Sequence, residues 1–118
     1  MGPYLQVAGQ WSIRQTNNHI VDINVTQDKD QISAFATHSN GTVKSLNANG
    51  HVEGPMFHIT IEWNNGTKGQ YDGGWKPNRA GMPGAVAEGG YLEGTTVDLM
   101  HTNVKAGWKS ENKVFYIR

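Results

Sequence analysis

The sequence predicts an all-β fold: a single domain over residues 1–118, built as an eight-stranded antiparallel up-and-down β-barrel. Three observations lead to this prediction. Apolar and polar residues alternate along several segments, which is the two-residue period of half-buried strands. Polar or glycine-containing turns separate these segments at intervals of about 8 to 12 residues, as in sandwiches and barrels. The chain has 118 residues, which is room for one hydrophobic core.

The alternation is clearest in residues 56–63, whose two expected faces are Phe57, Ile59, Ile61, Trp63 and His58, Thr60, Glu62. Residues 19–26 place Val21, Ile23 and Val25 together in the same way. Three Asn-Gly pairs, the strongest short signal for a hairpin turn, occur at Asn40-Gly41, Asn49-Gly50 and Asn65-Gly66. Together these signals predict strands near 5–15, 19–26, 31–38, 42–46, 51–63, 67–75, 90–100 and 105–118, the last broken by a bulge at Glu111-Asn112.

Closure of the sheet would remove its edge strands and leave a small interior, filled by side chains or by one small ligand. The connection 76–89 is long and rich in proline and glycine. Loops of that length in compact domains often act as lids or binding loops. We therefore expect a ligand at the barrel end that this loop flanks.

The amino-acid composition excludes some classes of binding partner. Ten Lys and Arg residues balance ten Asp and Glu residues, so nucleic acid and membrane surfaces are not expected partners. We expect a soluble chain without a signal peptide or transmembrane segment, because no apolar run approaches about 20 residues. The compartment stays open. The chain has no cysteine, which excludes disulfides, thiolate nucleophiles and Cys-ligated zinc. No cofactor is expected.

Four short segments stand in the same order and at similar spacing as in a known family of barrels. They are Gly9-Gln10-Trp11, the run 57–63 with Asn64-Asn65, Gly69-Gln70-Tyr71, and Ala106-Gly107-Trp108-Lys109-Ser110 with Phe115. In these segments the chain resembles the avidin/streptavidin family of biotin-binding barrels. The resemblance implies the barrel fold, a pocket wall at Trp63, and a Trp108 that reaches a neighbouring subunit. It also suggests a homo-oligomer, either a dimer or a tetramer.

The polar residues of that family's biotin site are largely replaced, so biotin is not the expected ligand. Ile13 and Asn17 stand near the positions of the first-strand Asn and Ser that hold the ureido oxygen. Ala36 and His38 stand near those of the third-strand Tyr and Ser, and Lys113 near that of the last-strand aspartate.

A second resemblance keeps a carbohydrate-binding lectin open. The segments Gly9-Gln10-Trp11-Ser12-Ile13 and Val21-Asp22-Ile23-Asn24-Val25 look like the start of a repeat in small barrel lectins that bind high-mannose glycans. Those lectins repeat the unit and carry a Trp-Gly-Gly loop, whereas this chain has one copy and the reversed order Gly73-Gly74-Trp75.

The leading hypothesis is a barrel that binds an uncharged or weakly polar small molecule, with a sugar as the ligand of the lectin alternative. The expected ligand-binding residues are Trp63, Tyr71, Trp75, Trp11, Arg79 and Asp98. Aromatic walls bind flat or apolar ligand faces by stacking and area burial. The strand that contains Asp98 carries apolar residues on both faces, which suggests a partner subunit. The expected interface residues are Trp108, Leu99 and Val97, on strands 90–100 and 105–118.

An enzyme is the third hypothesis. General acid–base catalysis needs a buried, positioned group, and the candidates are Asp98, His58 and Glu62. The last two would qualify only if the face of 56–63 that carries them pointed inward. The five histidines show no ligand spacing within one strand, and His19, His38 and His101 are expected at solvated strand ends. No metal site is therefore expected.

Overall fold

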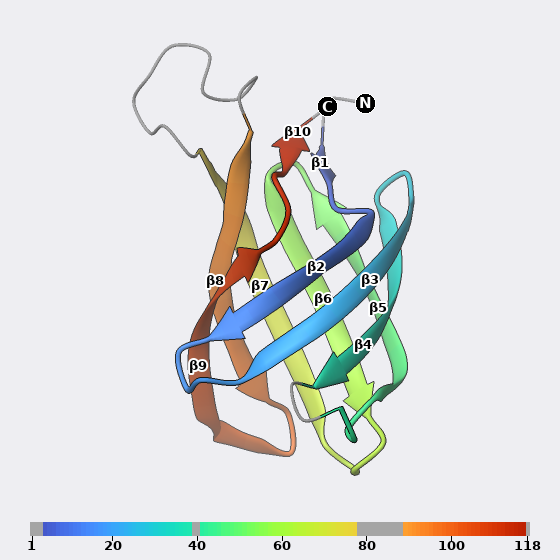
Figure 1. The fold of residues 1–118 in the computed structure, drawn as a ribbon, viewed down its shortest axis with the longest axis vertical. Helices are drawn as coiled ribbons and strands as arrows, with labels where there is room; N and C mark the ends of the chain where they lie inside the picture. Colours follow the sequence, from blue (N-terminus) through green and yellow to red (C-terminus); the bar gives the residue numbers. More distant parts are fainter. Residues whose placement is uncertain (1–3, 39–40, 78–88, 118) are drawn as a thin grey trace.

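The computed structural model describes residues 4–38, 41–77 and 89–117. Eight antiparallel strands close into a barrel in which each strand pairs with its neighbours in sequence (Figure 1). They are β2 (Gly9–Gln15), β3 (Ile20–Asp28), β4 (Gln31–His38), β5 (Ser45–Glu53), β6 (Met56–Trp63), β7 (Lys68–Pro77), β8 (Gly90–Asp98) and β9 (His101–Glu111). The predicted fold class is confirmed. In the described part of the chain, no helix is long and apolar enough to cross a membrane.

The pairing of β2 with β9 closes the barrel. Ser12 lies opposite Glu111, and Gln15 lies opposite Trp108. These strands come from opposite ends of the chain, so the sheet has no free edge there. Hydrogen-bonding groups that would otherwise be exposed along two edge strands are paired with each other.

Two short strands, β1 (Leu5–Gln6) and β10 (Tyr116–Ile117), pair with each other at one end of the barrel (Figure 1). Residues with positive φ lie where the chain leaves the barrel: Gly9 begins β2, and Asn112 follows β9. The expected strand 5–15 is therefore divided. The interruption expected at Glu111-Asn112 is present, but the barrel strand ends there instead of continuing past a bulge.

The prediction of a turn at Asn49-Gly50 was wrong, and with it the expected strands 42–46 and 51–63. Asn49 and Gly50 lie inside β5, and the turn to β6 is at Gly54-Pro55. Gly50 is needed for close approach: a Cβ there would lie 1.9 Å from the carbonyl oxygen of His58. At Gly54 the φ of +55° is the conformation that glycine provides in a two-residue hairpin turn.

The expected boundary between the last two strands was also wrong. The turn is Leu99-Met100, so residues 101–104 belong to β9. Asn65-Gly66 does lie in the turn between β6 and β7, with φ of +87° at Gly66. Gly41 has a φ of +78°, whereas Asn40 lies outside the described residues.

The core is the inside of the barrel. The alternation predicted for β3 and β6 is confirmed, because Val21, Ile23 and Val25 are buried and so are the four residues Phe57, Ile59, Ile61 and Trp63. Trp11 and Trp108 pack edge-on against the ring of Phe57 between them, with ring centroids 5.6 and 5.8 Å away. The aromatic residues therefore fill the middle of the barrel.

Candidate functional site

The two ends of the barrel differ. At the end that borders Pro77 and Gly90, the side chains of Leu5, Val7 and Phe115 are fully buried. The segment β1 is fixed there, because the amide N–H of Leu5 donates to the carbonyl of Gly54 (2.9 Å) and the side chain of Gln27 bonds to the backbone of both Leu5 and Val7. Side chains and the crossing β1 segment fill this end.

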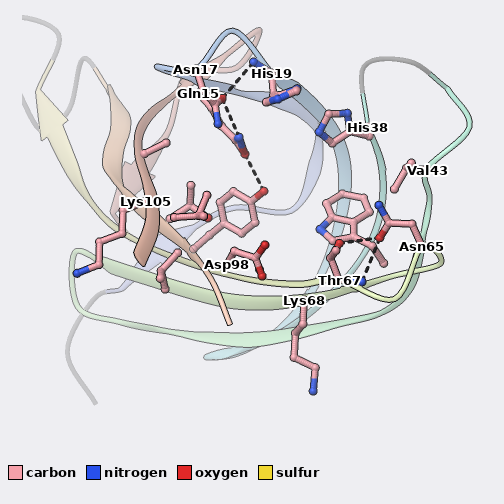
Figure 2. A pocket seen from close by; sticks show the side chains of 17 residues that line it. Gln15, Asn17, His19, His38, Val43, Asn65, Thr67, Lys68, Asp98 and Lys105 are labelled. Carbon is pink, nitrogen blue, oxygen red and sulfur yellow. Dashed lines mark hydrogen bonds between the residues drawn. The ribbon is translucent and has the colours of Figure 1, made fainter. Parts of the chain in front are cut away.

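The opposite end holds a cavity of about 330 Å³. Four connections surround it, namely those joining β2 to β3, β4 to β5, β6 to β7 and β8 to β9. Figure 2 shows the side chains that line the cavity. They are Gln15, Asn17, His19, His38, Val43, Trp63, Asn65, Thr67, Lys68, Gly69, Tyr71, Thr96, Val97, Asp98, Val104, Lys105 and Ala106.

Trp63 and Tyr71 form the inner wall, and both are almost fully buried. The Tyr71 hydroxyl donates to Gln15 Oε1 (2.8 Å), and the Gln15 amide nitrogen donates in turn to Asn17 Oδ1 (3.2 Å). Burial raises the pKa of Tyr71 to about 12, although a hydrogen bond with Thr96 acts in the opposite direction. The phenol is therefore neutral at physiological pH, and the floor of the cavity is polar but uncharged.

Two histidines lie together at the mouth. The rings of His19 and His38 are 4.8 Å apart, and His38 also packs edge-on against Trp63 (5.9 Å). The Nδ1 atom of His38 is buried and has no hydrogen-bond partner among the described residues. Burial, and secondly the neighbouring His19, lower the pKa of His38, which favours a neutral ring. His38 is the last residue of β4, as the prediction of a strand end requires, but it is only partly exposed and its Nδ1 atom is buried.

Charged side chains lie at the rim. Asp98 lines the cavity, and its carboxylate stabilises the β8–β9 turn by accepting from the Met100 amide (2.9 Å). Its second oxygen lies 3.4 Å from His101 Nδ1. In Figure 2 the side chains of Lys68 and Lys105 extend away from the cavity. The two lysine charges therefore point away from the enclosed space, whereas the Asp98 carboxylate belongs to the cavity lining.

The structure brings together Trp63, Tyr71, Asp98 and Val97 from the predicted residues. It does not bring Trp75 or Trp11 to this cavity. The Trp75 indole N–H donates to the carbonyl of Phe115 (2.9 Å) at the filled end, and Trp11 donates to Val7 (3.0 Å). The two aromatic residues brace the segments that cover that end.

The cavity lies at the opposite end from the one predicted. Alternation along a strand shows which residues point inward, but not which barrel end the terminal segments cover. Arg79 and residues 78–88 of the expected lid lie outside the described residues, so a role for that loop stays a prediction.

The prediction that Trp108 contacts a neighbouring subunit was wrong for its side chain. Trp108 is buried in the barrel, and its indole N–H donates to the carbonyl of Thr95 (3.0 Å). It has the same inward orientation as Phe57, which it contacts. Leu99 is exposed in the β8–β9 turn, next to the cavity wall at Val97. Association of two chains through Leu99 and Val97 stays a prediction.

The face of β6 that carries His58 and Glu62 points outward, since Phe57, Ile59 and Ile61 are buried on the other side. His58 Nδ1 lies 2.7 Å from Asp72 Oδ1, and Glu62 Oε2 lies 3.8 Å from Lys68 Nζ. The internal polar track that the enzyme hypothesis required of these two residues is therefore not formed. Asp98 is left as its candidate.

Gln15, Asn17, His19 and His38 are among the lining residues that sequence reasoning did not assign to the site. They lie at the ends of β2 and β4 and in the turn after β2. A signal was present, since Gln15 continues the inward parity of Trp11 and Ile13, and a polar residue there marks a wet end of the core. No group of three or more His, Cys, Asp or Glu residues suited to a metal ion occurs within the described ranges.

Comparison of the chain with protein-family models, curated proteins and solved structures gave no match.

Proposed function

We propose that this protein binds a small, uncharged, polar molecule in the open end of the barrel. The observation that carries the proposal is the cavity of about 330 Å³ with a buried aromatic inner wall and several hydrogen-bonding side chains around it. Sites for small molecules are typically concave, mostly apolar in their walls, and fitted with a few convergent polar groups. This end of the barrel is concave, has an aromatic inner wall at Trp63 and Tyr71, and brings several polar side chains together around it.

The lining selects the class of ligand. Trp63 and Tyr71 offer apolar surface, whereas Gln15, Asn17 and Thr96 offer amide and hydroxyl groups. Because Tyr71 stays protonated and His38 favours its neutral form, neither of these two side chains offers a charge to a ligand. An anion that entered beside them would lose its hydration without compensation and would also meet the Asp98 carboxylate. The volume is near the lower limit of known ligand pockets, about 300 Å³, which favours a compact molecule.

The avidin-like resemblance supports the same proposal through Trp63, which it places in a pocket wall. It also supports the proposal that the chain forms a homo-oligomer. A barrel that keeps the pocket-wall tryptophan while replacing the polar biotin contacts suits a different small molecule of similar size.

Native mass spectrometry of the purified protein tests both proposals, because it reports the subunit count and any co-purified small molecule. In parallel, heteronuclear NMR would follow the indole resonance of Trp63 during a screen of uncharged compounds of up to about 20 non-hydrogen atoms. We expect hits that shift Trp63 and bind the His38→Gln variant more weakly. A His51→Gln variant on the outer surface of β5 is the matched control.

A chain that carries no small molecule and yields no hit at Trp63 would overturn the proposed function. Hits that bind the His38→Gln and His51→Gln variants with the same reduced affinity would also contradict it, because the effect would then not come from the cavity. A monomeric mass would remove the proposed oligomer and leave the ligand proposal standing.

A further inference from the structure

A second concave surface lies on the outside of the barrel, over β2, β3 and β4. It is a groove of about 400 Å³ lined by Gln10, Trp11, Ser12, Asp22, Ile23, Asn24, Phe35, Thr37 and Asn112. The cross-strand register sets its layout: Asn24 lies between Gln10 and Phe35 on the neighbouring strands. Two residues before Asn24 on the same face of β3, Asp22 lies between Ser12 and Thr37 on the neighbouring strands. The groove is therefore part of the sheet's outer face, separate from the cavity at the mouth.

Phe35 is an aromatic side chain on an otherwise polar outer strand face. It is 55% exposed, and its neighbours Ala34 and Ala36 point to the inner side. Its neighbours on the same outer face of β4 are Ser33 and Thr37. A phenyl ring in this position offers a flat apolar surface to a molecule in solution. What sets this ring apart from other exposed apolar side chains is its place in the lining of a concave surface beside polar groups.

The polar groups around Phe35 are available. The side chains of Gln10, Asn24 and Thr37 make no hydrogen bond to another described residue. Asp22 is fixed from one side only, because its Oδ1 accepts from the Ser12 hydroxyl (2.7 Å). Ser12 is buried and Asp22 is exposed, so the hydrogen bond fixes one carboxylate oxygen while the second makes no hydrogen bond with another described residue.

Asn112 forms the remaining wall. It follows β9 with a φ of +70°, and its side-chain nitrogen lies 3.4 Å from Ser12 Oγ. The groove thus combines one aromatic platform, one carboxylate, amide groups and a hydroxyl, and none of its lining residues is basic. A phosphate or another anion would meet Asp22 without any compensating cation.

We propose that this groove binds a neutral saccharide. The apolar face of a sugar ring would stack on the Phe35 ring, which contributes by area burial. The Asp22 carboxylate and the Asn24 and Gln10 amides would accept from and donate to the ring hydroxyls, and hydrogen bonds to a charged acceptor are the strong ones. The groove is open on the barrel surface, so it can accept a unit within a longer glycan chain.

A glycan array followed by NMR titration with the best neutral oligosaccharide tests the proposal. We expect Phe35→Ala to weaken binding roughly tenfold, which is the upper range for one aromatic contact, and Phe35→Trp to preserve or strengthen it. Asp22→Asn keeps an acceptor for Ser12 but removes the charge, and we expect weaker binding there as well. Leu46→Ala is the matched control, because Leu46 is an exposed apolar residue (63%) outside the groove.

Three results would overturn the inference: an array without signal, saccharide binding that Phe35→Ala leaves unchanged, or Phe35-dependent self-association in analytical ultracentrifugation, which would assign the groove to a second copy of the chain. Binding at the mouth is scored separately by the Trp63 indole resonance. Failure at either site is therefore distinguishable from failure at the other.

Discussion

The Nδ1 atom of His38 is the unsatisfied buried side-chain atom among the described residues, and it belongs to a ring at the mouth of the cavity. Protonation would place a second N–H on this ring beside His19 and next to Trp63, with no acceptor in reach. At the same scale, Tyr71 and Gln15 satisfy each other in the floor. Single residues therefore keep the site uncharged at Tyr71 and His38.

The stability of the protein should fall on the acid side because of His38. The pKa of His38 is lowered in the folded state, so the unfolded chain takes up the proton first as pH falls below about 6.5. The stability that the neutral ring contributes is complete above that pH and is lost as pH falls toward the folded-state pKa. Urea unfolding at pH 7.5 and pH 5 should show a smaller pH dependence for His38→Gln than for the parent chain.

The His19→Gln variant separates the two causes of this shift. Burial is the larger cause and would remain, whereas the charge of His19 would be gone. An NMR titration of the His38 ring should therefore give a pKa that rises toward 6.5 but stays below it. A His38 pKa at or above the ordinary value in the parent chain would contradict the description of the mouth.

At the scale of elements, close approach between strands governs where glycine is required. Gly50 in β5 faces β6 so closely that a Cβ would meet the His58 backbone, and Gly94 in β8 meets the backbone of Asp72 in the same way. Glycine inside a strand often marks such an approach. An Asn-Gly pair therefore has two physical meanings, and its local sequence does not separate them.

Gly50→Ala should destabilise the fold by about 3 kcal/mol or more, because the contact is with backbone atoms that cannot move aside. Gly107→Ala is the matched control, since the nearest atom to its Cβ is the side-chain Cγ2 of Thr16 at 3.3 Å. We expect that variant to lose about 1 kcal/mol or less. Equal urea midpoints for the two variants would contradict the strand spacing described here.

At the scale of the whole molecule, the barrel is closed by its most distant strands. The pairing of Ser12 with Glu111 brings together the two ends of the chain, so the loop that must close is almost the full length of the domain. Closure of a long loop loses entropy before the contacts it allows are formed. The same closure fixes which end of the barrel is filled. The chain segments before β2 and after β9 leave the barrel at one end, and their strands β1 and β10 pair with each other there.

The main refolding phase should therefore be slow, on a timescale of about milliseconds to seconds, as for other β-proteins rich in non-local pairs. Stopped-flow tryptophan fluorescence after dilution from urea measures it, since Trp11, Trp63 and Trp108 are all buried in the barrel. A truncated chain that ends before β9 should lose the cooperative unfolding transition, because β2 then has no partner with which to close the barrel. A refolding rate faster than about 10⁴ per second would contradict a mechanism limited by closure.

The sequence by itself determined the all-β class, the inward faces of β3 and β6, and the placement of Trp63 and Tyr71 inside the barrel. These properties follow from side chains that alternate between two faces, which a linear pattern records directly. Only the tertiary structure decided that Gly50 lies in a strand and that the cavity opens beside His19 and His38. Those outcomes depend on the spacing of strands and on which end the terminal segments cover, and both arise from contacts between residues far apart in the chain.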